Sequence, residues 1–316
     1  MISKSASAPG KIIMFGEHAV VYGQPAIAVP VTQVQATASI SSLLSNFQDQ
    51  ILIEAPDINL VKYLSDLPEH SPFPILISTF KNIMGLTSLP SIKINISSTI
   101  PIAAGLGSGA ATSIAIIRAL SEYLGLNITN EVVSDISFQT EIIYHVTPSG
   151  IDNTVISFRQ PIYFHRDHPF VLLNINEPFL LLIAHSGEKS KTGEMVERVR
   201  NRWLAENKRF EKMFCQIGKL AIEARNVIEH ESYKYLGVLM NNNHKILQEI
   251  GVSTKKIDQL IQVALSAGAI GAKLSGSGGG GNLIALLEPD NINRVVSAFQ
   301  ANGISQIIIS KVDNQD

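Results

Sequence analysis

Hydrophobic residues in the N-terminal part of the chain follow the period of β-strands. Residues 12–15 form an apolar run between two turn signals, and residues 33–41 alternate and are rich in β-branched and small side chains. Residues 49–55 are expected to form a partner strand, and residues 91–100 a further one. Residues 74–86 are apolar at helical spacing and end near a glycine, which predicts a helix. This mixture predicts an α+β fold.

The middle of the chain changes to helical periodicity. A glycine-rich loop at residues 101–109 runs without a break into an apolar stretch, which predicts a helix reaching residue 120. Thr129 is expected to cap a second helix over residues 130–146. The following Pro and Gly, within residues 147–153, are expected to end that helix in a loop.

The C-terminal part of the chain predicts a second set of strands and helices. Pro178 precedes a fresh apolar run and marks the expected boundary between two domains, residues 1–177 and 178–316. The expected elements are strands at residues 154–158, 161–165 and 179–185, helices at about 192–205, 208–228, 233–250 and 255–267, a strand–glycine loop–strand unit at 271–287, a helix at 291–300 and a strand at 306–310.

Composition excludes several classes of protein. With 316 residues, 45% of them hydrophobic and 16% charged, the chain can bury two cores and shows no signature of disorder. A net charge of −2 argues against a general nucleic-acid or membrane-surface binder. Cys215 is the one cysteine, which excludes an intramolecular disulfide and a multi-cysteine metal site. No apolar run is long enough for a signal peptide or a membrane span, so we expect a cytoplasmic protein.

The first glycine-rich loop has the features of a phosphate-binding site. Gly105, Gly107 and Gly109 alternate just before a helix, where backbone N–H groups can converge and the helix dipole favours an anion. Two other interpretations stay open for the loop alone: a purely structural turn, and the dinucleotide fingerprint that residues 105–110 also fit. The fingerprint lacks its expected acid at the end of a second strand. No P-loop string occurs.

Titratable residues gather at two further places. Lys11, Glu17 and His18 surround the first short strand and its turn, while Glu141 near a helix end is followed by Asp152 in the next loop. Taken singly, each is also compatible with a solvated charge or a turn residue.

A second glycine loop interrupts two expected strands near the end of the chain. Its four consecutive glycines, residues 278–281, are entropically unfavourable unless another group must approach the backbone closely. This loop is therefore a further candidate for a binding element.

Three stretches together resemble the GHMP superfamily of small-molecule kinases, and within it most closely the mevalonate kinase family. They are APGKIIMFGEHAVVYG at residues 8–23, PIAAGLGSGAA at 101–111 and KLSGSGGGG at 273–281, with PSGIDN at 148–153 in support. The resemblance implies a two-domain GHMP kinase fold, with an N-terminal ribosomal-protein-like α/β sandwich and a C-terminal ferredoxin-like domain that bind ATP between them. It implies ATP-dependent phosphorylation of the primary C5 hydroxyl of mevalonate, and it suggests a homodimer.

The resemblance also implies roles for individual residues. By this resemblance Asp152 and Lys11 are catalytic; Lys11, Ala104, Gly105, Leu106, Gly107, Ser108 and Gly109 bind ATP; Glu17, His18, Asp152, Thr192 and Gly278 bind the substrate; and Glu141 and Ser108 hold Mg²⁺.

The chain departs from the family pattern at three positions. Ser108 is followed by Gly109 where the family has a second serine that binds magnesium, Val146 replaces a glycine, and Ser277 replaces an alanine of the last glycine loop. Two alternatives therefore stay open: a kinase for phosphomevalonate or another alcohol, and a catalytically silent relative that senses ATP or a metabolite.

Overall fold

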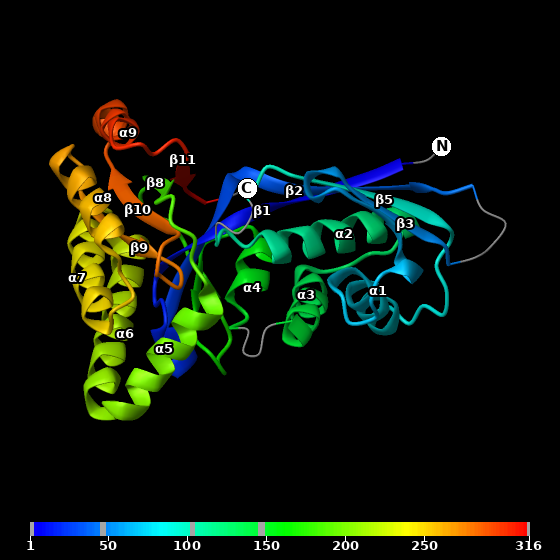
Figure 1. The fold of residues 1–316 in the computed structure, drawn as a ribbon, viewed down its shortest axis with the longest axis horizontal. Coiled ribbons are helices and arrows are strands. Elements are labelled where there is room, and N and C mark those ends of the chain that lie inside the picture. Colours follow the sequence, from blue (N-terminus) through cyan, green and yellow to red (C-terminus); the bar gives the residue numbers. More distant parts are fainter. Residues whose placement is uncertain (1–2, 45–48, 102–104, 145–148, 315–316) are drawn as a thin grey trace. The chain divides into compact units, whose positions relative to one another are not determined.

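The computed structural model describes residues 3–44, 49–101, 105–144 and 149–314. Contacts divide the chain into two compact units (Figure 1). The first unit comprises Met1–Lys11, Val34–Ile102 and Leu106–Arg159, and the second comprises Ile12–Gln33, Ala103–Gly105 and Gln160–Asp316. Strands β1 (Ser3–Phe15) and β2 (Ala26–Ser42) therefore contribute to both units. The expected boundary at residue 178 stays a prediction.

The first unit is built on a mixed sheet. The second half of β2 pairs antiparallel with β5 (Ile92–Ser98), and β5 pairs parallel with β3 (Ile51–Ala55). β4 (Leu60–Tyr63) closes the edge next to β3. Buried and half-buried residues alternate along β3 and at the start of β5, as the sequence pattern predicted.

Helices α1 (Pro72–Ile83), α2 (Ser108–Leu124), α3 (Asn130–Tyr144) and α4 (Ile151–Phe158) cover one face of this sheet (Figure 1). Single turns of 3₁₀ helix lie nearby at Pro56–Ile58 and Leu64–Asp66. Thr129 caps α3 as expected, because its hydroxyl accepts a hydrogen bond from the Val132 amide at 3.4 Å.

The expected strand at residues 154–158 is wrong, because these residues form α4. Gly150 starts the helix with a φ of 83°, and the Thr154 hydroxyl donates to the Gly150 carbonyl at 2.7 Å. The β-branched residues Thr154, Val155 and Ile156 favour a strand locally, but all are buried where α4 packs against α2 and α3. Tertiary packing overrides their local preference.

The second unit contains a four-stranded antiparallel sheet in the order β11-β8-β10-β9. The strands are β8 (Phe179–His185), β9 (Gly271–Ser275), β10 (Asn282–Leu287) and β11 (Ile307–Val312). Elsewhere in this unit, β6 (Ile162–Phe164) pairs with the first half of β2 and with the short strand β7 (Val171–Leu172).

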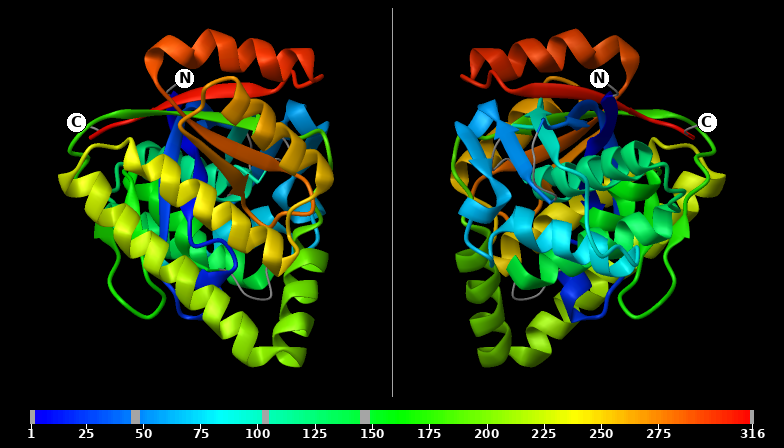
Figure 2. Two further views of the ribbon diagram at one scale, coloured as in Figure 1. Left: turned by 90° about the vertical axis from the view of Figure 1, so that its left-hand side faces the viewer. Right: turned by 90° about the vertical axis from the view of Figure 1, so that its right-hand side faces the viewer.

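Helices pack against this sheet to form the core of the second unit, and Figure 2 shows α6 and α7 running side by side. They are α5 (Thr192–Ala205), α6 (Asn207–His230), α7 (Tyr235–Ile250), α8 (Lys255–Ser266) and α9 (Ile292–Ala301), with 3₁₀ turns at Ala19–Tyr22 and Pro289–Asn291. Alternate strand residues such as Ala272 and Leu274 enter the core beside Phe214 and Leu247. Among the described residues, no helix is long and apolar enough to cross a bilayer.

Candidate active site

Lys11 lies near the middle of β1 and pairs with Asp152. Its side chain is nearly buried, and its Nζ is 2.9 Å from Oδ1 of Asp152, whose side chain is 30% exposed. The Lys11 amide donates to the Leu106 carbonyl at 2.9 Å, which joins β1 to the glycine loop. The structure therefore brings two of the predicted catalytic residues together with that loop in the first unit.

Gly107 packs directly on the Lys11 side chain. It has a φ of 75°, and a Cβ there would lie 2.9 Å from both Cγ of Lys11 and Cδ1 of Ile156. Glycine is thus required for two reasons, a left-handed backbone and a close approach. Gly109 differs, because it lies in α2 with no atom within 4 Å of an added Cβ.

Asp152 lies in the first turn of α4 rather than in a loop. The helix is held by Asn153, whose side-chain amide donates to the hydroxyl of Ser134 on α3 at 2.8 Å. Asp152 is thus presented by a fixed helix start, half-exposed, with Lys11 as its partner.

Glu141 completes this cluster from the last turn of α3. Burial and, to a smaller extent, the neighbouring Asp152 carboxylate raise the pKa of Glu141 to about 7, although the Lys11 ammonium acts to lower it. Two carboxylates thus share one nearby lysine.

The remaining residues that were predicted to bind ATP and metal lie in different parts of the structure. Ser108 begins α2 directly after Gly107, and Leu106 is buried. Gly105 falls in the second unit and has a φ of 72°. Ala104 lies outside the described residues. Within the described residues, no group of three His, Cys, Asp or Glu side chains forms a ready metal site.

The predicted substrate residues of the second unit gather around the second glycine loop. Nε2 of His18 lies 2.9 Å from the Ser277 carbonyl, and Oγ1 of Thr192 lies 3.2 Å from Oγ of Ser277. Gly278 has a φ of 73°, and a Cβ there would lie 2.2 Å from the Val252 carbonyl oxygen. The entropic argument for a close approach at this loop is therefore confirmed for Gly278.

Glu17 is held by a residue that the sequence analysis did not single out. Lys273, fully buried in β9, forms an ion pair with the Glu17 carboxylate and donates to the Leu274 carbonyl at 2.7 Å. Burial lowers the pKa of Lys273, and Glu17 opposes this effect. A lysine inside an apolar strand pattern was the available signal, because a buried charge requires a partner.

His18 has an unusual backbone and a buried ring. Its φ of 60° is positive, which is unusual and strained for a non-glycine residue. Burial lowers the pKa of its imidazole below the usual 6.5, so the ring is neutral at pH 7.

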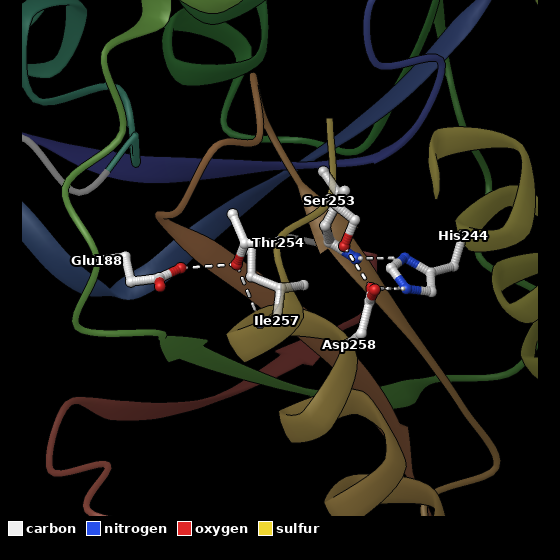
Figure 3. A network of polar contacts seen from close by, with 7 residues as sticks. Glu188, His244, Ser253, Thr254, Ile257 and Asp258 are labelled. Carbon is white, nitrogen blue, oxygen red and sulfur yellow. Dashed lines mark hydrogen bonds and ion pairs between the residues drawn. The ribbon is translucent and has the colours of Figure 1, made fainter. Parts of the chain in front are cut away.

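A second polar network fixes the segments around the glycine loop (Figure 3). The Thr254 hydroxyl at the start of α8 donates to the Glu188 carboxylate at 2.6 Å. Asp258 accepts hydrogen bonds from Ser253 at 2.5 Å and from Nε2 of His244 at 3.1 Å. The network joins α7, α8 and the chain after β8.

Comparison with known proteins shows the family to which the chain belongs. A family model described as "GHMP kinases N terminal domain" matches residues 75–160, and one described as "GHMP kinases C terminal" matches residues 224–305. The chain belongs to the GHMP kinase family. The resemblance of the three sequence stretches to this family is therefore confirmed.

Relatives and solved structures agree with this assignment. The GHMP kinase described here is 36% identical to the mevalonate kinase of Pyrococcus abyssi, over 96% of this chain and 94% of the relative. It is similar to the crystal structure of L. major mevalonate kinase in complex with R-mevalonate, with a TM-score of 0.81, 26% identity and coverage of 98% and 96%. The Methanococcus jannaschii mevalonate kinase shares the fold, with a TM-score of 0.85 at 24% identity and coverage of 98% of both chains. The predicted two-domain GHMP kinase fold is confirmed.

Proposed function

We propose that this GHMP kinase transfers the γ-phosphoryl group of ATP to the primary C5 hydroxyl of mevalonate, giving 5-phosphomevalonate and ADP. The observation that carries the proposal is the 2.9 Å ion pair of Lys11 and Asp152, beside a glycine turn that opens α2. The relatives named mevalonate kinase, such as the one 36% identical over 96% of this chain, support mevalonate as the acceptor.

Phosphoryl transfer requires mainly positioning and neutralisation of charge. The first amides of α2 have no partners within the helix, and together with the helix dipole they favour the phosphate groups of ATP. Lys11 would offset the negative charge that develops on the transferred group. Because Gly107 packs on the Lys11 side chain, the loop and the lysine are fixed relative to each other.

Asp152 would receive the proton of the attacking hydroxyl. Carboxylates are weak bases toward an alcohol, so this proton would move late, when bond formation has made the hydroxyl more acidic. The start of α4 and the ion pair with Lys11 hold the Asp152 carboxylate for this step.

The cluster fits a divalent cation. Glu141 and Asp152 bring two carboxyl groups to one lysine, so that ionisation of Glu141 leaves an excess of negative charge, and Ser108 adds a hydroxyl oxygen at the start of α2. Mg²⁺ prefers such oxygens and needs few protein ligands. When bound, Mg²⁺ would offset the negative charge of the phosphate groups. We assign Glu141 and Ser108 as its ligands.

The acceptor alcohol would be bound by residues of the second unit. We assign this role to Glu17, His18, Thr192 and Gly278. His18 and Thr192 contact Ser277 of the second glycine loop, and Glu17 pairs with Lys273 in β9, the strand before that loop. The neutral His18 ring and the Thr192 hydroxyl are groups that recognise hydroxyls through hydrogen bonds.

The acceptor is tested by ADP release with a panel of alcohols. Purified protein with MgATP is given mevalonate, phosphomevalonate, galactose or homoserine in turn. We expect turnover with mevalonate. Turnover with one of the other three alcohols but not with mevalonate would show that mevalonate is not the acceptor. No turnover with any of the four would favour the silent, metabolite-sensing alternative.

The role of Asp152 is tested by Asp152→Asn. We expect kcat to fall by about 10²–10⁴-fold, because the proton acceptor is lost, while KM for ATP changes little. Asp135→Asn, on the exposed face of α3, is the matched control and should keep wild-type kcat. Near-normal turnover of Asp152→Asn would remove Asp152 from the catalytic role.

Two further expectations stay predictions. The homodimer can be checked by light scattering on the protein as it elutes from a size-exclusion column. The cytoplasmic location can be checked by fractionation of cells that express the protein.

A further inference from the structure

We propose that Ser277 is a positioning residue that orders the protons of Thr192 and His18, so that Thr192 presents a hydrogen-bond acceptor to a hydroxyl group of the substrate. The proposal rests on the proposed function, which assigns Thr192 and His18 to the alcohol substrate. The family resemblance gives no role to Ser277, since it has alanine at this position.

A chain of three hydroxyl groups determines which atom donates at each step. The Ser190 hydroxyl lies 2.5 Å from the Gly278 carbonyl oxygen, which can only accept, so Ser190 donates its proton there. Ser190 and Ser277 are 3.0 Å apart, and Ser277 must therefore be the donor to Ser190. At 3.2 Å from Ser277, Thr192 must in turn donate to Ser277. The proton of Thr192 is thus donated to Ser277, and the oxygen of this exposed side chain is left as an acceptor.

His18 is ordered by the same residue through the backbone. The Ser277 carbonyl can only accept, so Nε2 of His18 carries the proton of this 2.9 Å hydrogen bond. The ring is neutral, because burial lowers the pKa of His18. Nδ1 therefore keeps its lone pair.

Ser277 is itself held in a rigid frame. The Gly279 amide donates to the Val252 carbonyl at 2.7 Å, and the Gly281 amide donates to the Glu188 carbonyl at 2.9 Å. The Glu188 side chain is fixed in turn by Thr254 at the start of α8 (Figure 3). The order of the protons is therefore set before the substrate binds, which lowers the entropy lost on binding.

The Thr192 acceptor selects a hydroxyl that is not the reacting one. The proton of the reacting C5 hydroxyl is assigned to Asp152, and a hydroxyl has one proton to donate. The other hydroxyl of mevalonate is at C3, so we assign the acceptor on Thr192 to that group. An anionic group such as the substrate carboxylate would be disfavoured beside an acceptor whose own proton is already donated elsewhere.

The test compares mevalonate with 5-hydroxy-3-methylpentanoate, which lacks the C3 hydroxyl. For the wild type we expect KM to be about tenfold lower for mevalonate, the size of one hydrogen-bonded contact to a neutral partner. In Ser277→Ala this preference should shrink by at least about threefold, with KM for ATP unchanged, because Thr192 regains a free proton. Ser310→Ala, which removes a buried hydroxyl of β11 that has no hydrogen-bond partner among the described residues, should keep the full preference.

A double-mutant cycle shows whether Ser277 acts through Thr192. Thr192→Val should reduce the preference as Ser277→Ala does, the double variant should reduce it no further, and Thr192→Ser should keep it because the hydroxyl remains. Equal use of both substrates by the wild type, an undiminished preference in Ser277→Ala, or additive effects in the double variant would each overturn the proposal.

The experiment separates this proposal from the function on which it rests. Absence of ADP release by the wild type with mevalonate would overturn the acceptor, and the same variants are then compared by the KM of whichever alcohol in the panel is turned over. The Tm values of the wild type, Ser277→Ala, Thr192→Val and the double variant test the Ser277–Thr192 hydrogen bond without an activity assay. Losses of Tm that are not additive support the link, and additive losses overturn it.

Discussion

Lys11 brings one positive charge to a cluster that holds the carboxylates of Asp152 and Glu141. The lysine pairs with Asp152 at 2.9 Å, while burial and the nearby Asp152 raise the pKa of Glu141 to about 7. Glu141 is therefore the carboxyl group in this cluster whose charge changes near neutral pH. A bound cation would favour its ionised form, so metal binding and proton release are coupled.

The raised pKa of Glu141 predicts a pH dependence of stability and activity. The folded protein keeps the Glu141 proton up to about pH 7, whereas the unfolded chain releases it near 4.5. The stability from this group is therefore full below about pH 4.5 and is lost as the pH rises through about 7. Urea denaturation should show that wild type loses stability relative to Glu141→Gln between about pH 5 and 8. A constant difference would contradict the prediction.

Activity should change in the opposite direction. As a ligand for Mg²⁺, Glu141 must be ionised, so kcat/KM for ATP at low magnesium should rise between about pH 6 and 8. Excess Mg²⁺ should move this rise to lower pH, because the cation competes with the proton. Glu141→Gln should lower kcat/KM and remove this step. A pH profile that is insensitive to magnesium would contradict the assigned role.

At the scale of elements, the start of α2 gives different functions to glycines that look equivalent in the sequence. Gly107 has a left-handed φ of 75° and lies against Lys11, whereas Gly109 lies within the helix and faces open space. The alternation of glycines predicted a turn that can bind phosphate. Their individual roles depend on β1, which brings Lys11 to Gly107.

This difference predicts unequal effects of two alanine substitutions. Gly107→Ala should destabilise the fold by about 1–2 kcal/mol through its left-handed backbone alone. It should also lower kcat by at least about tenfold, because the added Cβ would displace Lys11. Gly109→Ala is the matched control and should leave stability unchanged or raise it by up to about 1 kcal/mol. Thermal unfolding and ADP release measure both, and equal effects at the two positions would contradict the prediction.

At the scale of the whole molecule, pairing between distant parts of the chain decides the second unit. Glu17 and Lys273 are 256 positions apart and form a buried ion pair in which Lys273 is fully enclosed. Ser275, two residues further along β9, donates to the Ile13 carbonyl at 2.7 Å. Alternate residues of β9 thus hold the segment that carries Glu17 and His18.

Removal of one partner of this pair should be far more harmful than removal of both. Lys273→Met should destabilise the fold by about 3–5 kcal/mol, because the Glu17 carboxylate remains buried without its lysine. Glu17→Gln combined with Lys273→Met should recover most of this stability while activity stays low. Lys191→Met breaks an exposed pair with Glu194 and should have no measurable effect in the same denaturation experiment. A double variant no more stable than Lys273→Met would contradict this account.

Local patterns in the sequence carried much of the fold. The helices of the C-terminal half begin and end within a few residues of their expected positions, since amphipathic periods and caps act over one or two turns. The strand–glycine loop–strand unit is likewise confirmed as β9 and β10. The three motifs at residues 8–23, 101–111 and 273–281 were together also sufficient to indicate a GHMP kinase.

By itself, the sequence thus determined most helices and strands, the two glycine loops and the family, because these depend on neighbouring residues and motif spacing. Only the tertiary structure decided that residues 151–158 form a helix, that Lys273 pairs with Glu17, and that Ser277 holds Thr192. The physical reason is the same in each case. Burial and partner choice are set by residues distant in the chain, and the free energy of those contacts exceeds the local preferences that a sequence pattern expresses.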